Sequence, residues 1–276
     1  MTDSYVAEVE AGQRFEFGNN WKHYLAEIDD IRIRAAEDAT RGMLGLASLD
    51  GKTFLDVGSG SGLFSLVALR LGASSVRSFD YDPQSVECTG ALKHRYYPSH
   101  SNWIIERGSV LDTQYLNSLG QFDVVYSWGV LHHTGNLEQA LENVAPLVAP
   151  GGRLFLSIYN YQPFWSSYWK LIKRTYNRLP KTGRIPMELA FFSFFGAAFF
   201  AADVIRGRNP SERWAGRGQR GMSMFVDVQD WIGGYPFEVA SPEEIFCFYR
   251  DRGFTLRELK TCGGRHGCNQ FVFERQ

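Results

Sequence analysis

The sequence predicts an α/β protein with a doubly wound, mainly parallel seven-stranded sheet, an antiparallel C-terminal hairpin and a helical insertion. Between residues 51 and 158, short apolar segments alternate with amphipathic ones, which is typical of parallel strands joined by helices. The first apolar segment runs into a glycine-rich turn, as in sheets that bind a ligand beyond their strand ends. The last two apolar segments flank no helix, so we expect them to form the hairpin at the sheet edge.

The elements follow in a regular order along the chain. Strands are expected at 53–57, 75–80, 103–107, 122–127, 152–158, 254–260 and 269–273. Helices are expected between the first five strands at 62–71, 83–95 and 136–148. Asn136 and Gln139 have the spacing of a capping box, and Pro83 after Asp82 marks a helix start. The chain should therefore divide into an N-terminal helical cap (1–50), a ligand-binding core (51–158), a helical insertion (159–240) and a C-terminal αββ unit (241–276).

The turn after the first strand is the most informative motif. In the run Phe54-Leu-Asp-Val-Gly-Ser-Gly-Ser-Gly-Leu-Phe64, an apolar strand is followed by three glycines in alternate positions. Glycine adds no Cβ and tolerates positive φ, so a ligand can approach the backbone there. The third glycine, Gly62, comes one place too early for a dinucleotide fingerprint, and the chain has no P-loop motif. The turn therefore favours a nucleotide-like cofactor other than a nicotinamide dinucleotide.

This run resembles motif I of class I S-adenosylmethionine methyltransferases, and three later segments fall in the order that the family requires. Residues 75–80 end in Asp80, whose carboxylate can accept both ribose hydroxyl protons. Residues 108–112 resemble the adenine-contacting motif. Residues 122–133 match the fourth-strand segment of small-molecule enzymes such as the ubiquinone-pathway O-methyltransferases. The resemblance implies a Rossmann-like core, S-adenosyl-L-methionine as cofactor and S-adenosyl-L-homocysteine as product.

A candidate site follows from the strand ends and the resemblance together. The residues expected to bind the cofactor are Asp56, Gly58, Ser59, Gly60, Gly62, Asp80, Tyr81, Leu111, Asp112, Ser127 and Trp128. Several have a second interpretation: Asp56 or Asp112 could cap a helix or turn, and Asp82 is a better cap than ligand. Trp128 and Phe64 could belong to the core or stack on the cofactor. No metal ligand is expected.

Two histidines after the fourth strand are the candidate catalytic residues. Methyl transfer is an in-line displacement that needs alignment of the reacting atoms and exclusion of water. A hydroxyl acceptor must also lose its proton, and histidine suits that task near neutral pH. We favour His133 as the base, with His132 beside it. Either histidine could instead cap the helix at 136–148.

Composition favours a cytoplasmic enzyme. The net charge of the 276 residues is −1, which offers no general attraction to nucleic acid. The first twenty residues are polar and acidic, without the pattern of a signal peptide. The four cysteines are scattered and are expected to be reduced thiols. Cys262, His266 and Cys268 suggest zinc, but a glycine turn between two strands is the better interpretation.

The insertion differs in composition from the rest of the chain. Residues 165–220 carry eleven Lys and Arg against three acids. Residues 189–202 are apolar on all sides, but 14 residues are fewer than the ~20 needed to span a bilayer. A buried or lid helix is favoured, and an interfacial membrane segment or a groove for a lipid-linked acceptor is the alternative. The family commonly carries its substrate cap at this position, which implies that the insertion shapes the acceptor site.

Further segments resemble one bacterial group of these methyltransferases over nearly the whole length. They are residues 15–21, 126–134, 157–160, 220–222, 230–238 and 267–271. Members of this group suggest cell-surface saccharide or secondary-metabolite pathways. We expect a small-molecule or saccharide-like acceptor, methylated at oxygen. Gly233, Gly234 and Pro236 mark a rigid turn, and the aromatic residues Trp231, Tyr235 and Phe237 could line the acceptor pocket or pack against the core. Two rival hypotheses are a non-catalytic scaffold docked on a membrane through 189–202 and a tRNA methyltransferase using the basic insertion, although no Asn/Asp-Pro-Pro motif for base methylation follows the fourth strand.

Overall fold

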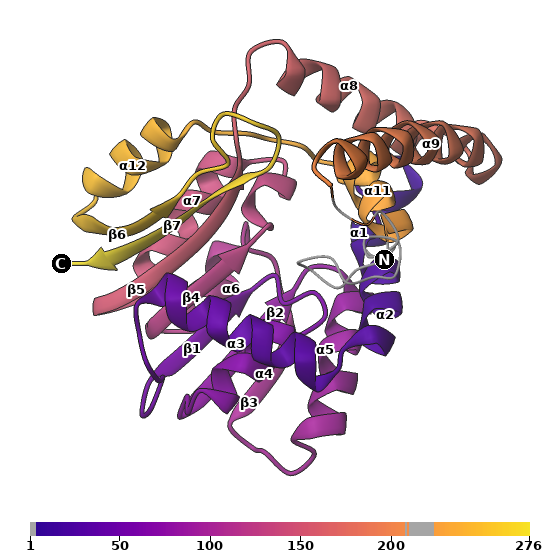
Figure 1. Cartoon of the computed structure of the whole chain (residues 1–276). Helices are drawn as coiled ribbons and strands as arrows, with labels where there is room; N and C mark the ends of the chain where they lie inside the picture. The colour runs from indigo at the N-terminus through magenta and orange to yellow at the C-terminus, as the bar shows by residue number, and fades with distance from the viewer. Residues whose placement is uncertain (1–3, 208, 210–223) are drawn as a thin grey trace.

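A seven-stranded sheet forms the centre of the molecule (Figure 1). The computed structural model describes residues 4–207, 209 and 224–276, and the side chains of all of these except 224–227. The strands are β1 (Thr53–Val57), β2 (Ser75–Asp80), β3 (Trp103–Arg107), β4 (Phe122–Trp128), β5 (Val148–Tyr159), β6 (Phe254–Lys260) and β7 (Cys268–Arg275). Their order in the sheet is β3-β2-β1-β4-β5-β7-β6. The first five strands are parallel, and β7 runs antiparallel between β5 and β6. The predicted mainly parallel sheet with a C-terminal hairpin is confirmed.

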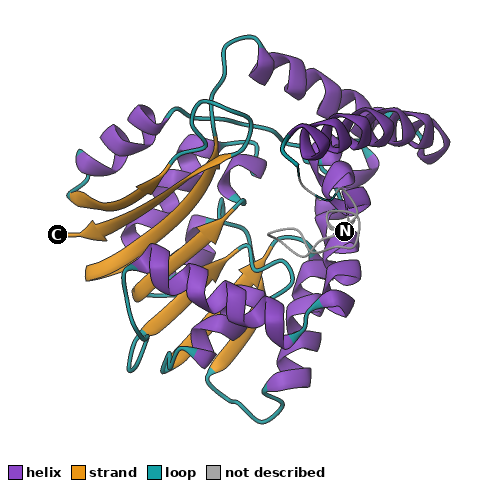
Figure 2. Ribbon diagram, in the orientation of Figure 1, coloured by secondary structure: helices purple, strands orange, loops and turns teal. Residues whose placement is uncertain are grey.

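Helices cover both faces of the sheet (Figure 2). One layer contains α3 (Asp30–Leu44), α4 (Leu63–Arg70) and α5 (Pro83–Tyr96), and the other contains α6 (Thr113–Asn117), α7 (Leu137–Val144) and α12 (Pro242–Arg250). Side chains alternate between the faces along each strand: Phe54 packs against the first layer, and Leu55 packs against the second. Both faces are therefore apolar, as a parallel sheet between two helical layers requires.

The helix starts follow the sequence signals. Asp82 caps α5 by accepting a hydrogen bond from the Gln84 N–H at 2.9 Å, with Pro83 in the first helical position. Asn136 caps α7 by accepting from the Gln139 N–H at 3.3 Å. The helix predicted to reach residue 148 ends at Val144 and continues as a 3₁₀ turn. Pro146 explains the difference, because proline lacks the N–H that the next α-helical hydrogen bond would need.

The insertion forms a separate helical group beyond one end of the sheet (top of Figure 1). It contains α8 (Trp165–Arg178), α9 (Lys181–Ile205) and α11 (Met224–Gly233), and the N-terminal helices α1 (Ser4–Glu10) and α2 (Phe17–Glu27) lie below it. The predicted 14-residue apolar segment is the middle of α9, which has 25 residues. The expectation that this segment is buried is wrong, because only Gly196 and Asp203 of α9 are buried. Part of the basic insertion, including Arg213, Arg217 and the segment 220–222, lies outside the described residues.

Candidate functional site

A cavity of about 250 Å³ lies at the carboxyl ends of the parallel strands. The strand order reverses between β1 and β4, and ligands of doubly wound sheets bind at such a switch point. The predicted site residues that line it are Gly58, Asp80, Tyr81, Leu111, Trp128, His132 and His133. The predicted residues outside its lining are Asp56, Ser59, Gly60, Gly62, Asp112 and Ser127.

The glycine turn lets the strand ends approach one another. Gly58 has φ 78°, and a Cβ there would lie 2.4 Å from the Cγ1 atom of Val130 in the loop after β4. Gly62, with φ 80°, packs against α5, since a Cβ there would lie 3.0 Å from the Cα atom of Thr89. Gly58 is therefore needed for the close contact between the glycine turn and the loop after β4, whereas Gly62 is needed for the packing of α4 against α5.

Asp80 presents an oriented carboxylate to the cavity. Its Oδ2 accepts a hydrogen bond from the Gly60 N–H at 2.9 Å, and its Oδ1 accepts from the Asp82 N–H at 3.0 Å. Burial raises the pKa of Asp80 to about 6, so the group is ionised at neutral pH. Each carboxylate oxygen can accept a second hydrogen bond. Asp80 can therefore receive the two hydroxyl protons of a ribose.

A buried polar network supports the turn from below. Asp56 accepts a hydrogen bond from the Ser65 hydroxyl at 2.5 Å, and Ser65 lies 2.7 Å from the Ser78 hydroxyl. The Trp103 indole donates to Ser78 at 2.8 Å. Burial raises the pKa of Asp56 to about 7. Asp56 thus joins β1 to α4 and β2 in this structure, and its contact with a cofactor stays a prediction.

Three other predicted binding residues make structural contacts. Asp112 is exposed and caps α6 by accepting from the Tyr115 N–H at 3.0 Å, which agrees with the capping interpretation. The Ser59 hydroxyl lies 2.9 Å from the Thr89 hydroxyl. The buried Ser127 hydroxyl donates to the Val57 carbonyl at 3.3 Å and joins β4 to β1. Their contacts with a cofactor also stay predictions.

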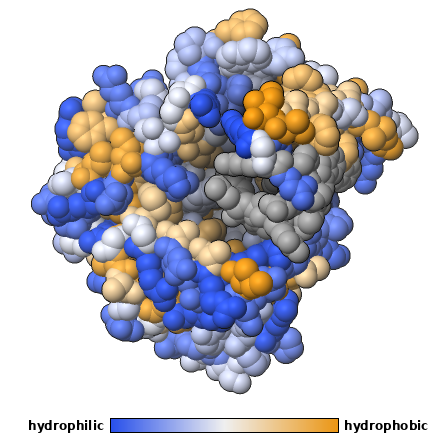
Figure 3. Space-filling view, viewed as in Figure 1, coloured by the Kyte–Doolittle hydropathy of each residue, from blue (hydrophilic) through white to orange (hydrophobic). Residues whose placement is uncertain are grey.

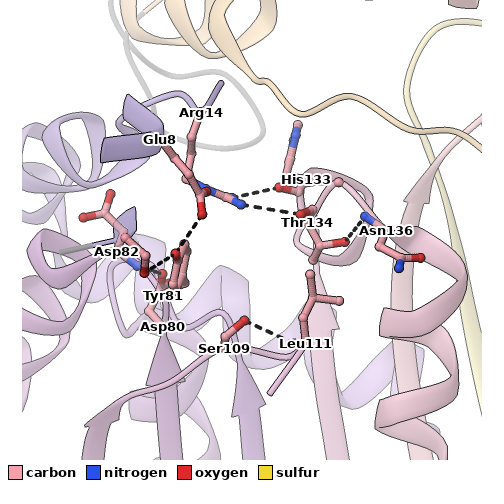
Figure 4. A network of polar contacts seen from close by, with 12 residues as sticks. Glu8, Arg14, Asp80, Tyr81, Asp82, Ser109, Leu111, His133, Thr134 and Asn136 are labelled. Carbon is pink, nitrogen blue, oxygen red and sulfur yellow. Dashed lines mark hydrogen bonds and ion pairs between the residues drawn. The ribbon is translucent and has the colours of Figure 1, made fainter. Parts of the chain in front are cut away.

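The N-terminal segment forms a roof over the cavity (Figure 4). The Arg14 guanidinium lies 4.9 Å above the Tyr81 ring and forms an ion pair with Glu8 at 2.6 Å. It also donates to the His133 carbonyl at 3.0 Å, while the Tyr81 hydroxyl donates to Glu8 at 2.9 Å. Sequence analysis missed Glu8 and Arg14. The only signal nearby was the family-like run at 15–21, which follows Arg14 directly.

Both histidines are buried and neutral. His133 Nδ1 lies 2.7 Å from the Pro236 carbonyl oxygen; since a carbonyl only accepts, Nδ1 carries the proton and Nε2 carries the lone pair. Burial lowers the pKa of His133 to about 3. His132 Nδ1 accepts from the Tyr159 N–H at 3.3 Å, and burial lowers the pKa of His132 as well. Neither histidine caps α7, because Asn136 does so.

The predicted turn at 233–236 holds His133 in place. A Cβ on Gly234 would lie 3.0 Å from His133 Cε1, so the turn and the imidazole are in close contact. Phe17 also packs against the imidazole, with ring centroids 4.8 Å apart. Of the aromatic residues near the turn, Trp231 lines the cavity, whereas Phe237 is buried.

A buried lysine, Lys173, lies against Trp231, which lines the cavity. Sequence analysis missed this residue. The Lys173 ammonium donates to the Trp231 carbonyl and lies 5.0 Å from the ring centroids of both Trp231 and Phe237. Burial lowers the pKa of Lys173 to about 7. Its sequence context, an ordinary amphipathic helix, offers no signal, because only the fold places the side chain among aromatic rings.

The described residues contain no group of three or more His, Cys, Asp or Glu side chains arranged to hold a metal ion. Residues 261–267 connect β6 to β7, and the Cys262 thiol donates to the Arg265 carbonyl at 3.0 Å. The cavity instead suits a nucleoside-bearing cofactor. It has a carboxylate for a ribose at Asp80, and Leu111 and Tyr81 provide apolar and aromatic walls for a base.

Comparisons with known proteins point to methyltransferases. A family model described as a methyltransferase domain matches residues 21–196. A segment of 112 residues is 32% identical to a ribosomal protein L11 methyltransferase of Xanthomonas oryzae pv. oryzae, covering 40% of this chain and 32% of that protein. A segment of 122 residues is 32% identical to a mitochondrial ubiquinone biosynthesis O-methyltransferase of Dictyostelium discoideum, covering 41% of this chain and 36% of that protein. The chain thus spans about a third of the length of these relatives.

The fold also resembles that of solved methyltransferases. The crystal structure of magnesium protoporphyrin IX methyltransferase from Synechocystis PCC 6803 with bound SAH superposes with a TM-score of 0.52. The two chains are 14% identical, and the match covers 88% of this chain and 83% of that one. At this identity the similarity concerns the fold alone.

Proposed function

The chain belongs to the family of S-adenosylmethionine-dependent methyltransferases, and we propose that it transfers a methyl group to a hydroxyl oxygen of a small-molecule acceptor. One observation carries the proposal. A single cavity is lined by an oriented carboxylate at Asp80 and by a neutral imidazole at His133, whose Nε2 bears the lone pair. The name of one curated relative, a ubiquinone biosynthesis O-methyltransferase, supports oxygen as the methylated atom.

The residues at one end of the cavity fit S-adenosylmethionine, which supplies an electrophilic methyl group when bound. Asp80 would accept the ribose hydroxyls, and the backbone of Gly58 would lie against the cofactor. Tyr81 and Leu111 would contact the adenine, and Trp128 would face the sulfonium. Asp80 is the only one of these five residues whose side chain carries a negative charge to balance the positive charge of the cofactor. We therefore expect Asp80 to contribute most to affinity.

The roof gives the chain a means of excluding water. Arg14 connects the loop after β2, through Tyr81, to the loop after β4, through the His133 carbonyl. Exclusion of water strengthens electrostatic interactions in the site and prevents side reactions. Since the roof comes from the N-terminal segment, its opening would control cofactor entry.

His133 would take the proton of the acceptor hydroxyl at Nε2. With a pKa of about 3 it is a weaker base than an exposed histidine. A hydroxyl proton becomes strongly acidic once its oxygen shares electrons with an electrophile, so a weak base suffices if proton and methyl move together. The low pKa also keeps His133 unprotonated, and therefore ready to accept, down to acidic pH.

The remaining walls suit a flat or ring-shaped acceptor. Tyr159 and Trp231 line the cavity with their rings perpendicular, 5.7 Å between centroids. Aromatic walls of this kind pack against the faces of aromatic rings and of sugars. A phenol or a saccharide that enters a cavity of about 250 Å³ is a better fit than a folded macromolecule, and this argues against tRNA.

The test has two stages. Calorimetric titration with S-adenosylmethionine and S-adenosylhomocysteine should give micromolar binding, with no response to NAD. Methyl-labelled S-adenosylmethionine is then offered with a panel of phenols, catechols and nucleotide sugars. His133→Gln should keep the S-adenosylhomocysteine affinity but lower transfer by about 10²–10⁴-fold, while exposed His94→Gln should change neither. Lack of cofactor binding, or full transfer by His133→Gln, would refute the corresponding part of the proposal.

A further inference from the structure

Helix α9 exposes an apolar surface that the fold does not use. Its most apolar stretch has a mean hydropathy of 1.7, and only 6% of that stretch is buried. Outward-facing side chains include Phe194 (66% exposed), Phe200 (54%) and Ile205 (85%). Figure 3 shows hydrophobic residues gathered over this helix at the upper right. Soluble monomers rarely expose so much contiguous apolar surface unless it binds something.

Helix α8 extends the same surface with aromatic side chains. Trp165, Tyr168 and Leu171 are exposed on α8, and Phe164 is exposed just before it. The rings of Trp165 and Tyr168 lie 5.7 Å apart. Tryptophan and tyrosine are enriched where proteins meet the headgroup region of a bilayer. We define the α8–α9 face as the exposed side chains of residues 164–206.

The charges on the α8–α9 face have one sign. The exposed charged side chains are Lys170, Arg174, Arg178, Lys181 and Arg206. The segment has only two acids against these five cations, and neither is exposed: Glu188 is half-buried beside the Tyr176 hydroxyl, and Asp203 is buried. Because the whole protein has a net charge of only −1, this positive field is local. Basic residues beside an apolar helix favour an anionic lipid surface over a neutral one.

The apolar helix cannot cross the bilayer while the fold is intact. The helices on either side of it in the chain, α8 and α11, pack together: Trp169 of α8 lies 5.4 Å from Trp231 of α11, between ring centroids. Both ends of α9 must therefore remain on one side of a membrane. The connection at 206–223 carries five arginines, which makes a return through hydrocarbon very unfavourable. With both ends on one side of the membrane, α9 can bury its exposed apolar side chains only by lying along the bilayer surface.

We propose that the protein docks peripherally on anionic lipid bilayers through the α8–α9 face. Docking would bring the acceptor end of the cavity close to the lipid. The rings of Phe199 and Phe195 lie 6.1 Å apart, and those of Phe195 and Trp169 lie 6.3 Å apart. Trp169 in turn contacts Trp231, which lines the cavity. A continuous aromatic path thus joins the docking surface to the site, although docking itself does not require the proposed activity.

Vesicle flotation of the full chain tests the proposal. The protein should float with vesicles that contain phosphatidylglycerol, float weakly with pure phosphatidylcholine, and lose binding as salt screens the charges. Phe194→Ser with Phe200→Ser should lower the partition coefficient by about tenfold or more for each residue. Lys170→Gln with Arg174→Gln should lower it by about fivefold for each charge on anionic vesicles. Ile31→Ser with Leu259→Ser, which alter exposed apolar residues on α3 and β6, should have no effect.

Three results would overturn the proposal. The first is a wild-type protein that does not float with anionic vesicles. The second is equal loss of flotation in the control pair and in the Phe194/Phe200 pair, with S-adenosylhomocysteine affinity retained in both, because the surface would then not be specific. The third is resistance of the bound protein to extraction by high salt and alkaline carbonate, which would indicate a spanning helix. If the face instead joins two copies of the chain, sedimentation would show a dimer that the phenylalanine substitutions dissociate, and flotation would be absent.

Discussion

Replacing Asp80 with asparagine should weaken cofactor binding while leaving the fold in place. The asparagine side chain would be nearly the same size, but it would have one acceptor oxygen where the carboxylate has two. The Gly60 and Asp82 N–H groups both point at this side chain, so one of them would face an amide NH₂. That mismatch should cost about 1–3 kcal/mol of stability, which thermal unfolding would measure.

The effect on affinity follows from the lost charge. A hydrogen bond to a charged group contributes about 1.5–3 kcal/mol, which corresponds to about 10- to 150-fold in affinity for each ribose hydroxyl. Calorimetry with S-adenosylhomocysteine should therefore show at least a tenfold rise in Kd. The wild-type affinity should also fall about tenfold per pH unit below pH 6, where Asp80 becomes protonated. Asp80→Asn should lose this dependence, because the substituted side chain does not titrate there.

Asp123→Asn is the matched control. Asp123 also accepts two hydrogen bonds, both at Oδ2, from the Thr53 N–H at 2.8 Å and the Thr53 hydroxyl at 2.9 Å. These bonds favour the ionised carboxylate and lower the pKa of Asp123, so loss of the charge should cost stability. It lies at the start of β4, at the opposite end of the parallel strands from the cavity, so its substitution should lower stability but not affinity. A Kd for Asp80→Asn within about twofold of the wild type would show that the ribose assignment is wrong. An equal loss in Asp123→Asn would show that the effect is one of stability.

Three further predictions concern the closure of the cavity and its histidines. The Cβ of Gly58→Ala would meet Val130, so this variant should lose about 2–4 kcal/mol of stability in urea unfolding. Gly129 has a similar φ, but a Cβ there would have no atoms within 4 Å, so Gly129→Ala should lose only about 1–2 kcal/mol. Arg14→Gln removes the roof contacts and should speed S-adenosylhomocysteine dissociation in stopped-flow measurements; an unchanged rate would mean that the roof does not gate the site. As the pH is lowered from 6.5 to about 3, the free energy of unfolding should fall by about 1.4 kcal/mol per pH unit because of His133. In this range His133 is protonated in the unfolded chain but stays neutral when buried in the folded one. A pH slope unaltered in His133→Gln would contradict this.

Local signals predicted the elements of the core accurately. The strands at 53–57, 75–80, 103–107 and 254–260 have the predicted bounds, because each is a short run that ends at a glycine or polar turn. The caps at Asp82 and Asn136 formed as expected, since each cap depends on residues only two or three positions apart. The apolar run in α9 misled the prediction because hydrophobicity alone does not reveal whether a helix has a partner to pack against.

The sequence by itself determined the sheet, the glycine turn and the placement of Asp80 at a strand end, because these depend on neighbours along the chain. Only the tertiary structure decided which of the predicted residues face the cavity. Asp56 and Gly62 support the turn, whereas Asp80 and His133 reach the cavity. It also brought Arg14 over Tyr81 and the Pro236 carbonyl to the His133 imidazole, about 100 residues away in the chain. Contacts of this kind depend on how distant segments pack, and no local pattern records them.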